Sequence, residues 1–587
     1  MCGIAGLILS SEAAPADPAL LARMLRALAH RGPDGTGQMV LGTVALAQNR
    51  LAIIDLETGD QPIFSGPATL IANGEIYNYR ELRAEIGEEN FSTQGDCEPA
   101  LLLWRQMGSD YARRLRGMFA IAIHERVGRQ VTLTRDPFGI KPLYTAQTEG
   151  GLAFASEPRA LLDSGVVSRR LRAEARDELL QLQFTTGSST IFAGIDRLLP
   201  GETVTCAEGH VIGRVQEQAL PEGGPEAIDE DTALERLDRA LEESVLLHQR
   251  SDVPYGMFLS GGVDSSALLA MMVRLNNQPV LAYTAGWDVG GVADEREHAA
   301  AVAQAVGAQH EAVEITEAMV WRHLPEIVGC MDDPAADYAI IPSWFLARRA
   351  AQDVKVVLSG EGGDELFGGY GRYRRATRPW WLGGRVMRGR GNFDRLDVLR
   401  RRPTGWRDGF AASEQRAGSS GRTRLAAAQA ADIADWLPHD LLLKLDRCLM
   451  AHALEGRTPF LDKGVADAVF RLPDELKLRG RMGKWLLRRW VEKHLPVAAP
   501  FSPKRGFTVP VGAWIGGKAA RLGPLVAAQP GVAEVAEAGK IEALFRKAEE
   551  PGTGFAAWLL LFYALWHRRH ILGLMPAGDV FETLSVH

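Results

Sequence analysis

The pattern of apolar residues changes once along the 587-residue chain, and this change constrains the fold more than any other feature. Up to about residue 210, short apolar runs suited to strands are separated by Gly, Pro and Asp turns and interrupted by two helical segments. From about residue 231, strands alternate with helices, which is typical of parallel sheets. The stretch 220–226, rich in Gly, Pro and Glu, is the best candidate for a linker. The sequence therefore predicts two domains of different fold class.

We predict an α+β domain over residues 2–210, a linker over 211–230 and an α/β parallel-sheet domain over 231–575 that becomes mostly helical beyond about residue 425. The strands expected in the first domain are Ile4–Leu9, Val44–Ala47, Leu51–Asp55, Thr69–Ala72, Phe119–His124, Gln130–Asp136 and Leu152–Ser156, and its helices are Pro18–Ala29 and Glu98–Met107. The strands expected in the second domain are Tyr255–Leu259, Val280–Ala285, His310–Val313 and Val354–Leu358. Its helices are expected at Asp231–His248, Ser265–Leu275, Glu297–Val306, Asp440–Ala453, Lys484–Lys493 and Gly554–Leu572.

Composition narrows the function classes. The formal net charge of −7 gives no reason to expect a nucleic-acid partner. The five cysteines are scattered and form no C-x-x-C pattern, so neither a disulfide framework nor a zinc site is expected. The sequence has neither an apolar run of the roughly 18 residues that a membrane span requires nor a signal-peptide pattern. We therefore predict a cytoplasmic protein without a membrane partner.

Cys2 is the first candidate for chemistry. If Met1 is removed, which a small second residue permits, Cys2 carries both a thiol and a free α-amino group. The pKa of an α-amino group is about 7.7–8.0, so the amine can take the proton of the thiol on the same residue. Position alone favours a simpler role, in which Cys2 is a small buried apolar residue ahead of a strand.

Two Gly-rich loops follow predicted strands and indicate a nucleotide site. The first, SGGVDSS at 260–266, opens a helix whose N–H groups form an anion site; it lacks the Gly-Lys-Ser/Thr of a Walker A loop, which favours pyrophosphate release. The second, SGEGGDELFGGY at 359–370, holds three carboxylates among five glycines. Asp264 and Asp364 are the expected magnesium ligands. The alternatives are helix capping by Asp264 and an acidic surface turn for the second loop.

With these motifs the chain resembles the glutamine-dependent asparagine synthetases, from Cys2 to at least Lys504–Phe507. The shared runs are MCGIAG, HRGPDG, NGEIYNYRELR, RDPFGIKPLY, LSGGVDSS, LSGEGGDELFGGY and RTPFLD. The resemblance implies an N-terminal class II glutaminase with an Ntn-type αββα sandwich, followed by an ATP-pyrophosphatase domain of adenine nucleotide α-hydrolase type. It further implies a homodimer acting on small molecules, namely glutamine, ATP and aspartate, with Mg²⁺.

In the first domain, the resemblance implies that Cys2 attacks the side-chain amide of glutamine and forms a γ-glutamyl thioester. Asn73 and the main-chain N–H of Gly74 match the oxyanion hole. The resemblance also assigns glutamine binding to Arg50, Leu51, Ala52, Ile53, Ile54, Glu75 and Asp96, with Arg50 on the carboxylate and the two acids on the ammonium group. The residues leave simpler roles open, namely a surface ion pair for Arg50 and a hairpin turn at Asn73-Gly74.

In the second domain, the resemblance implies that a carboxylate attacks the α-phosphorus of MgATP and that ammonia, delivered through a tunnel, displaces AMP. Glu361 matches a residue that orients or deprotonates ammonia, and Lys484 matches a cation that stabilises charge on the phosphates. Lys484 could equally be a solvated residue at a helix start. The ATP-binding residues implied are Phe258, Ser260, Gly261, Gly262, Asp264, Ser265, Ala285, Ser359 and Gly360, and the metal ligands are Asp264 and Asp364.

Two regions look individual rather than motif-like, namely 287–295 on the acceptor side and the arginine-rich segment 372–407, which we expect to be a solvated or partner-facing helical insertion. The first hypothesis is therefore an asparagine synthetase with aspartate as the acceptor. The two regions leave open a second hypothesis, an amidotransferase for another carboxylate such as a sugar acid or a peptide side chain. Cyclising relatives such as β-lactam synthetases generally lack the N-terminal cysteine and are disfavoured. A non-enzymatic nucleotide- or glutamine-binding scaffold is the third hypothesis; it predicts decay of one site, and the sequence shows none.

Overall fold

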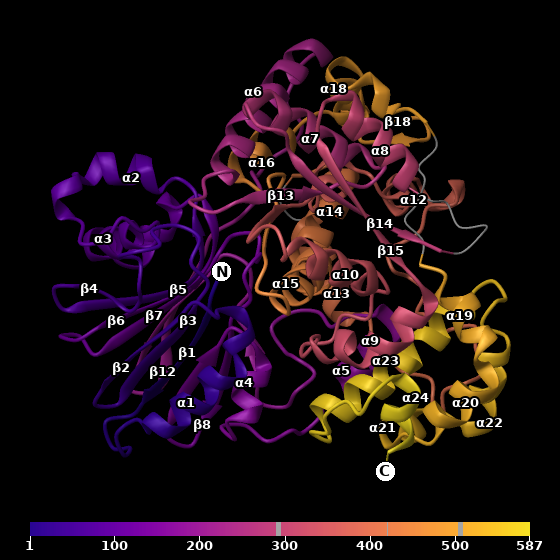
Figure 1. Ribbon diagram of the computed structural model, residues 1–587, viewed down its shortest axis with the longest axis horizontal. Helices are drawn as coiled ribbons and strands as arrows, with labels where there is room; N and C mark the ends of the chain where they lie inside the picture. Colours follow the sequence, from indigo (N-terminus) through magenta and orange to yellow (C-terminus); the bar gives the residue numbers. More distant parts are fainter. Residues whose placement is uncertain (289–294, 419–420, 503–508, 587) are drawn as a thin grey trace.

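The computed structural model describes residues 1–288, 295–418, 421–502 and 509–586. Figure 1 shows a β-rich N-terminal part beside a larger part built of a central sheet and many helices. The predicted family run Lys504–Phe507 and most of the acceptor-side region 287–295 lie outside the described residues. No helix in the described ranges is long and apolar enough to cross a membrane.

The N-terminal part is built on two six-stranded antiparallel sheets, with orders β10-β8-β9-β1-β3-β2 and β12-β11-β7-β6-β5-β4. Apolar side chains including Ile4, Leu46, Ile71 and Leu133 form one buried cluster between the sheets. The strands are β1 (Gly3–Leu9), β2 (Gly35–Leu41), β3 (Val44–Arg50), β4 (Ile63–Ser65), β5 (Ala68–Ile76), β6 (Gly117–Glu125), β7 (Gln130–Arg135), β8 (Tyr144–Thr148), β9 (Gly151–Ala155), β10 (Asp196–Arg197), β11 (Glu202–Ala207) and β12 (His210–Gln216). Most of β12 lies in the range predicted as a linker, 211–230.

Helices cover the outer faces of both sheets. Helix α1 (Pro18–Ala27) begins with Pro18 and is capped by Asp17, whose carboxylate accepts from the N–H of Ala19 at 2.8 Å. Its apolar face contacts β1 and β3, whereas α3 (Glu98–Met107) contacts β5 of the other sheet. The remaining helices of this part are α2 (Tyr79–Ile86), α4 (Pro158–Asp163) and α5 (Ala173–Leu182). The predicted αββα sandwich is therefore confirmed.

The second part is built on a five-stranded parallel sheet with the order β15-β14-β13-β16-β17. Its strands are β13 (Tyr255–Phe258), β14 (Leu281–Trp287), β15 (Gln309–Ile315), β16 (Val356–Leu358) and β17 (Glu455–Arg457). The chain adds strands on one side of β13 and then reverses to the other side at β16. Ligands of open parallel sheets bind at such a switch point, and the loops 260–266 and 359–370 leave the sheet there.

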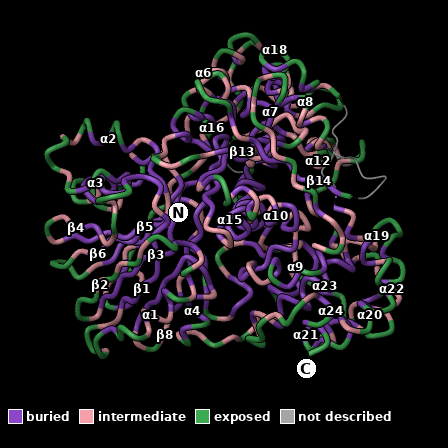
Figure 2. The backbone as a smooth tube through the Cα atoms, viewed as in Figure 1, coloured by how far each residue is buried: buried purple, intermediate pink, exposed green. Residues whose placement is uncertain are grey.

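Helices bury both faces of this parallel sheet, as the alternation within β16 shows. Val356 and Leu358 belong to one apolar cluster, and Val357 between them belongs to another. The first cluster includes residues of α6 (Glu230–His248), α7 (Val263–Leu275), α8 (Arg296–Ala305), α16 (Lys463–Val469) and α18 (Trp485–His494). The second includes residues of α9 (Glu317–Gly329), α10 (Ile340–Ala350) and α15 (Leu442–Met450). Figure 2 shows the sheet region buried and the outer helices exposing one side.

The C-terminal part is helical, as predicted. Helix α23 (Gly554–His570) is buried along nearly its whole length, and the helix predicted at 440–453 is a π-helical segment, 432–441, followed by α15. The further elements are α11 (Gly363–Phe367), α12 (Gly371–Thr377), α13 (Asp408–Gly418), α14 (Arg424–Ala431), α17 (Asp474–Lys477), β18 (Leu478–Arg479), β19 (Met482–Gly483), α19 (Val511–Gly517), α20 (Ala519–Ala527), α21 (Pro530–Val535), α22 (Ala538–Arg546) and α24 (Val580–Ser585).

The predicted strand Leu51–Asp55 is wrong, because this segment is a loop that follows β3. Its main chain bonds to side chains rather than to a strand. The N–H of Ala52 donates to Asp34 Oδ2 and the N–H of Asp55 to Asp252 Oδ2, both at 2.8 Å. Leu51, Ile53 and Ile54 are buried nonetheless, so the segment has the apolar run of a strand without its hydrogen bonds.

The arginine-rich segment exposes most of its arginines, as predicted, but it is not the helical insertion that the sequence predicts. Its only α-helix in the described ranges is α12, at its start. The guanidinium groups of Arg372 and Arg388 lie over the ring of Trp436, at 3.6 and 3.7 Å from its centroid. Arg372 also pairs with the buried carboxylate of Asp432 at 2.7 Å. Aromatic faces and a buried acid thus hold these two arginines against the core.

Two candidate active sites

Cys2 lies directly before β1 and faces the buried amide of Asn73 in the middle of β5. The N–H of Cys2 donates to Asn73 Oδ1 at 3.1 Å, and its C=O accepts from Arg31 Nε at 3.0 Å. The Nδ2 group of Asn73 is buried and has no hydrogen-bond partner among the described residues. The amide that holds the main chain of Cys2 therefore keeps an unused donor. Because Asn73 and Gly74 both lie within a paired strand, the hairpin-turn alternative is wrong.

Gly74 follows Asn73 where β5 approaches β6 closely. A Cβ at this position would lie 2.1 Å from the carbonyl oxygen of Met118 and 2.6 Å from Cα of Phe119. Neither neighbour can move away, because both belong to the backbone of β6. The strand can therefore pass this point only as glycine, which leaves the main chain of residue 74 bare at the wall of the cavity that contains Cys2.

Two buried carboxylates form another wall of this cavity. Burial raises the pKa of both Glu75 and Asp96, and the neighbouring charge of Asp96 raises that of Glu75 further. Asp96 is held by the N–H of Ile76, which donates to its Oδ2 at 2.8 Å. A bound cation would favour ionisation of both buried acids, so this wall suits an ammonium group.

Arg50 ends β3 and is buried, but it forms an ion pair with the exposed carboxylate of Asp60, so the alternative of a surface ion pair is correct in part. Its guanidinium donates to Asp60 Oδ1 at 2.9 Å and to the carbonyl oxygens of Ile54 and Asp55. The loop that it holds lines the cavity through Leu51, Ile53 and Ile54, whereas Ala52 does not line it.

Burial raises the pKa of the Cys2 thiol, although the terminal ammonium group, the main chain of Leu51 and the charge of Arg50 oppose this. A thiol in this environment needs a base before it can attack. The ammonium group of Met1 is itself buried and lies 2.9 Å from Glu455 Oε2, a carboxylate contributed by β17 of the second part. No motif in the sequence marks Glu455.

The loop 260–266 forms a tight, internally bonded turn at the start of α7. The N–H of Ser260 donates to Ser265 Oγ at 3.1 Å, and Ser265 Oγ–H donates to the carbonyl of Ser260 at 2.9 Å. The N–H of Gly261 donates to the carboxylate of Glu295 at 3.2 Å. A negatively charged oxygen therefore occupies the expected anion site in the described structure.

Lys484 lies between the two carboxylates predicted as metal ligands. Its Nζ is 2.7 Å from Asp364 Oδ1 and also pairs with Asp264 Oδ2. Although burial lowers the pKa of Lys484, the two carboxylates raise it above its usual value. Glycines let the loops approach this closely, since a Cβ on Gly369 would lie 1.8 Å from Asp364 Oδ1. Two carboxylates that converge on one cation also fit a divalent ion that takes its other ligands from phosphates and water.

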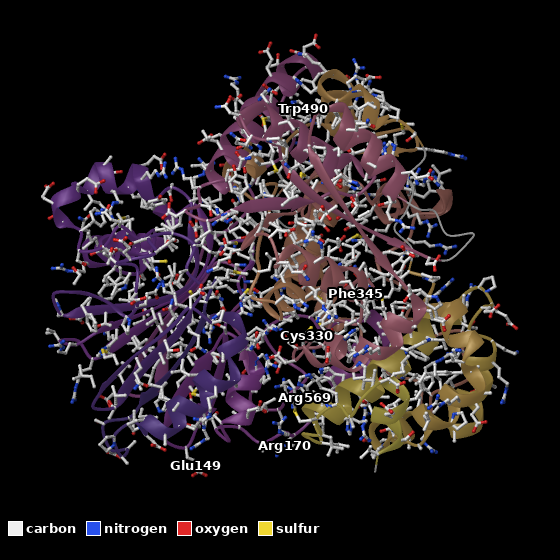
Figure 3. All side chains as sticks on the ribbon, viewed as in Figure 1. Glu149, Arg170, Cys330, Phe345, Trp490 and Arg569 are labelled. Atoms are coloured by element: carbon white, nitrogen blue, oxygen red, sulfur yellow. The ribbon has the colours of Figure 1, made fainter. Side chains whose placement is uncertain are left out.

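Lys484 is buried at the N-cap of α18, and the solvated alternative is therefore wrong. Its φ of 58° is held by its N–H, which donates to the carbonyl of Phe367 at 3.1 Å. Trp490, labelled on α18 in Figure 3, donates its indole N–H to Asp238 Oδ1 of α6 at 2.8 Å. The helix that presents Lys484 is thus fixed to its neighbour.

Glu361 follows β16 and is half-buried near a second lysine. Burial raises the pKa of Glu361, and the charges of Asp337, Asp364 and Asp264 add to this while Lys444 opposes it. Lys444 Nζ lies 2.9 Å from Asp337 Oδ2. The sequence does not predict that Lys444 and Asp337 lie near Glu361, because neither residue belongs to a motif or lies close to Glu361 along the chain.

The cavity over the phosphate loop contains only some of the predicted ATP residues. Of the predicted ATP residues, Gly261, Gly262 and Asp264 line it, together with the predicted metal ligand Asp364 and the predicted catalytic residue Lys484. The others do not line it, namely Phe258, Ser260, Ser265, Ala285, Ser359 and Gly360. Phe258 ends β13, and Ala285 lies within β14 rather than at its end.

The cavity is also lined by His298 and Arg488, which the sequence analysis missed. Arg488 lies four residues after Lys484 on α18, and this spacing is a signal that could have found it.

Comparison with known proteins agrees with this division into two sites. The asparagine synthase family matches residues 236–568, and the glutamine amidotransferase domain family matches residues 1–217. The chain belongs to the asparagine synthase family. It is 33% identical to asparagine synthetase 1 (glutamine-hydrolysing) of Bacillus subtilis, over 88% of each chain. It is 29% identical to asparagine synthetase B of Escherichia coli, over 84% of this chain and 79% of that protein. It is 35% identical, over 97% of both chains, to a Mycobacterium tuberculosis protein that is provisionally named a glutamine-hydrolysing asparagine synthetase.

In this member of the asparagine synthase family, the two matched regions separate the two sites. Cys2, Asn73 and Asp96 lie within the amidotransferase match, whereas Asp264, Asp364 and Lys484 lie within the synthase match. The two matches are joined across residues 218–235, which include the Gly- and Pro-rich stretch 220–226.

Proposed function

We propose that this protein is a glutamine-dependent asparagine synthetase, which releases ammonia from glutamine at Cys2 and uses it to amidate aspartate at the expense of ATP. The observation that carries the proposal is the presence of both halves of this chemistry in one chain. Cys2 faces a buried amide donor, and Lys484 bridges two carboxylates at the switch point of the parallel sheet. A binding scaffold has no need of either arrangement.

In the first half-reaction, removal of Met1 frees the α-amine of Cys2 to act as the base that its buried thiol requires. The Nδ2 of Asn73 and the N–H of Gly74 stabilise the oxyanion of the tetrahedral intermediate, and one such donor is worth about 2.7–4 kcal/mol. Glu75 and Asp96 bind the α-ammonium group of glutamine, and Arg50 binds its carboxylate. The product of attack is a γ-glutamyl thioester on Cys2, which water hydrolyses.

In the second half-reaction, the carboxylate of aspartate attacks the α-phosphorus of ATP, and ammonia then displaces AMP. The loop 260–265 binds the pyrophosphate, Lys484 neutralises charge that develops on the phosphates, and Glu361 takes a proton from ammonia. Mg²⁺, held by Asp264 and Asp364, supplies further charge neutralisation when it is bound. Phe258, Ala285, Ser359 and Gly360 bind the rest of the nucleotide.

The proposal extends to organisation and location. It includes a glutaminase domain at 2–210, a linker at 211–230, a synthetase domain at 231–575 and a tunnel for ammonia between the sites. It also includes a homodimer in the cytoplasm. In support of a reducing compartment, all five cysteines lie in the described ranges and all are free thiols.

A panel of acceptors tests this function. Purified protein with glutamine, MgATP and aspartate is expected to give glutamate, asparagine, AMP and pyrophosphate, with pyrophosphate release dependent on aspartate. Sugar acids and a peptide with an aspartate side chain serve as alternative acceptors. Glutaminase activity without aspartate-dependent pyrophosphate would favour an amidotransferase for another carboxylate. Binding of glutamine and ATP without release of glutamate or pyrophosphate would favour a scaffold.

A further inference from the structure

Arg457, within the RTPFLD run, is a fully buried residue at the end of β17 whose side chain reaches Glu75, in the wall of the cavity that contains Cys2. Its Nη2 lies 3.2 Å from Glu75 Oε2, across the boundary between the two matched regions. Its Nε pairs with Glu455 Oε1 at 2.6 Å, and its Nη1 donates to the carbonyl oxygens of His248 and Arg250 at 2.9 and 2.6 Å. The guanidinium is therefore anchored by the synthetase domain and directed at Glu75.

The main chain of Arg457 belongs to the nucleotide site at the same time. Its carbonyl oxygen accepts from the N–H of Ser359 at 2.8 Å. Arg457 itself pairs in register with Leu358 of β16. Ser359 is the first residue of the loop that carries Glu361 and Asp364. One residue thus contacts Glu75 of the glutamine pocket through its side chain and the nucleotide loop through its backbone.

The charges around Glu75 show what the guanidinium does there. Burial, Asp96 and Glu455 all raise the pKa of Glu75, whereas Arg457 and the terminal ammonium group lower it. The pKa of Glu75 is raised above its usual value even with Arg457 present, and Arg457 is the first of the charges that oppose this, so its loss would raise the pKa further. A protonated Glu75 has no net charge with which to bind an ammonium group.

We propose that Arg457 is a positioning residue for glutamine, a cation supplied by the synthetase domain that holds Glu75 where it binds the α-ammonium group of the substrate. This inference rests on the function proposed above, in which Glu75 contacts that group. It follows that the glutamine pocket is complete only when β17 is docked against the N-terminal sandwich.

Replacing Arg457 with Gln tests the role in the full-length protein. Its KM for glutamine in glutamate release is expected to rise about 10- to 100-fold, with kcat within about threefold, because a buried charge pair loses one partner. In the pH profile of kcat/KM, the acidic limb is expected to move to higher pH, because loss of the guanidinium raises the pKa of Glu75. Pyrophosphate release with ammonium as nitrogen donor is expected to stay within about threefold, because the bond from Ser359 to the main chain is kept.

Two further variants separate positioning from structure. Arg457→Lys keeps the positive charge and is expected to recover part of the glutamine affinity and the pH profile. Glu81→Gln is the matched control, because it removes an exposed pair with Arg250 that also joins the two domains, at 2.6 Å, without touching Glu75. The inference is overturned if Arg457→Gln leaves the KM and the pH profile unchanged. It is also overturned if the Gln and Lys variants lose both activities together. A wild-type protein without glutaminase activity would refute the proposed function itself.

Discussion

Replacing Lys484 with Met is expected to remove ATP-dependent amidation and leave glutamine hydrolysis intact. The ammonium group of Lys484 lies 2.7 Å from Asp364 Oδ1 and also pairs with Asp264. At an effective dielectric constant of about 20, one contact at this distance is worth about 6 kcal/mol before desolvation. Removing one partner of a buried pair costs about 3–5 kcal/mol after desolvation is included. We therefore expect kcat for amidation to fall at least about 100-fold.

The assay is pyrophosphate release with ammonium as the nitrogen donor, which bypasses the glutaminase site, together with glutamate release as a measure of that site. Lys493→Met is the matched control, because Lys493 is exposed in the last turn of the same helix. The two carboxylates hold the pKa of Lys484 above its usual value, so the lysine is charged at any assay pH near neutrality. The ratio of wild-type to variant rates is therefore expected to be constant from pH 6.5 to 8.5.

Two results would refute this reasoning about Lys484. The first is pyrophosphate release within about threefold of wild type, which would mean that the ion pairs contribute nothing to the reaction. The second is loss of glutamate release in parallel, which would mean that the variant no longer folds around the sheet. Lys484→Arg distinguishes a requirement for charge from a requirement for shape, because it keeps the charge on a longer, planar group.

Three further predictions address the glutaminase site and the nucleotide loop. Cys2→Ala is expected to abolish glutamate release and spare ammonia-dependent pyrophosphate release; loss of both would contradict separable sites. Asn73→Ala is expected to lower kcat for glutamine about 10²–10³-fold with little change in KM, because its donor acts on the intermediate; a change in KM alone would contradict an oxyanion role. Burial, followed by the charge of Asp364, raises the pKa of Glu365 to about 8, so the folded state binds a proton that the unfolded state releases near pH 4.5. Between pH 4.5 and 8 the unfolded state therefore ionises Glu365 more readily than the folded state, and the free energy of unfolding falls as pH rises. The gain in melting temperature from Glu365→Gln is expected to grow over that range. A gain independent of pH would contradict this prediction.

The fold could be predicted where side-chain pattern and main-chain bonding agree. The buried runs at β13 and β14 are apolar because helices cover both faces of a parallel sheet, and the sequence shows this directly. Strand β17 shows no such pattern, since its three residues are Glu455, Gly456 and Arg457. Its charged side chains are buried against groups of another domain rather than in an apolar layer, so no periodicity in the sequence marks the strand.

The site divides in the same way between local and distant residues. Cys2, Asn73 and the glycines of the two loops could be assigned because each acts within a short segment whose motif is visible. Arg457 contacts Glu75 only because two domains meet, and a contact of this kind leaves no mark on the residues next to either partner. The strand prediction for residues 51–55 is wrong although the local pattern is clear, because the apolar side chains of this loop line a pocket instead of covering a sheet face.

The contact between Arg457 and Glu75 depends on the relative position of the two domains, and buried charges fix that position. Arg31 of the sandwich is fully buried and donates to Asp446 Oδ2 at 2.8 Å and to Glu157 Oε1 at 2.7 Å. Arg197, at the end of β10, is also buried and donates to Asp333 of the second part through Nε and Nη2, at 2.6 Å each. Sliding one domain over the other would leave several of these charges buried and unpaired, and a single broken buried pair costs about 3–5 kcal/mol. An apolar interface would tolerate such a shift far better, because hydrophobic contact has no direction. The ionic interface therefore determines which residue of β17 faces Glu75, and through it which residue completes the glutamine pocket.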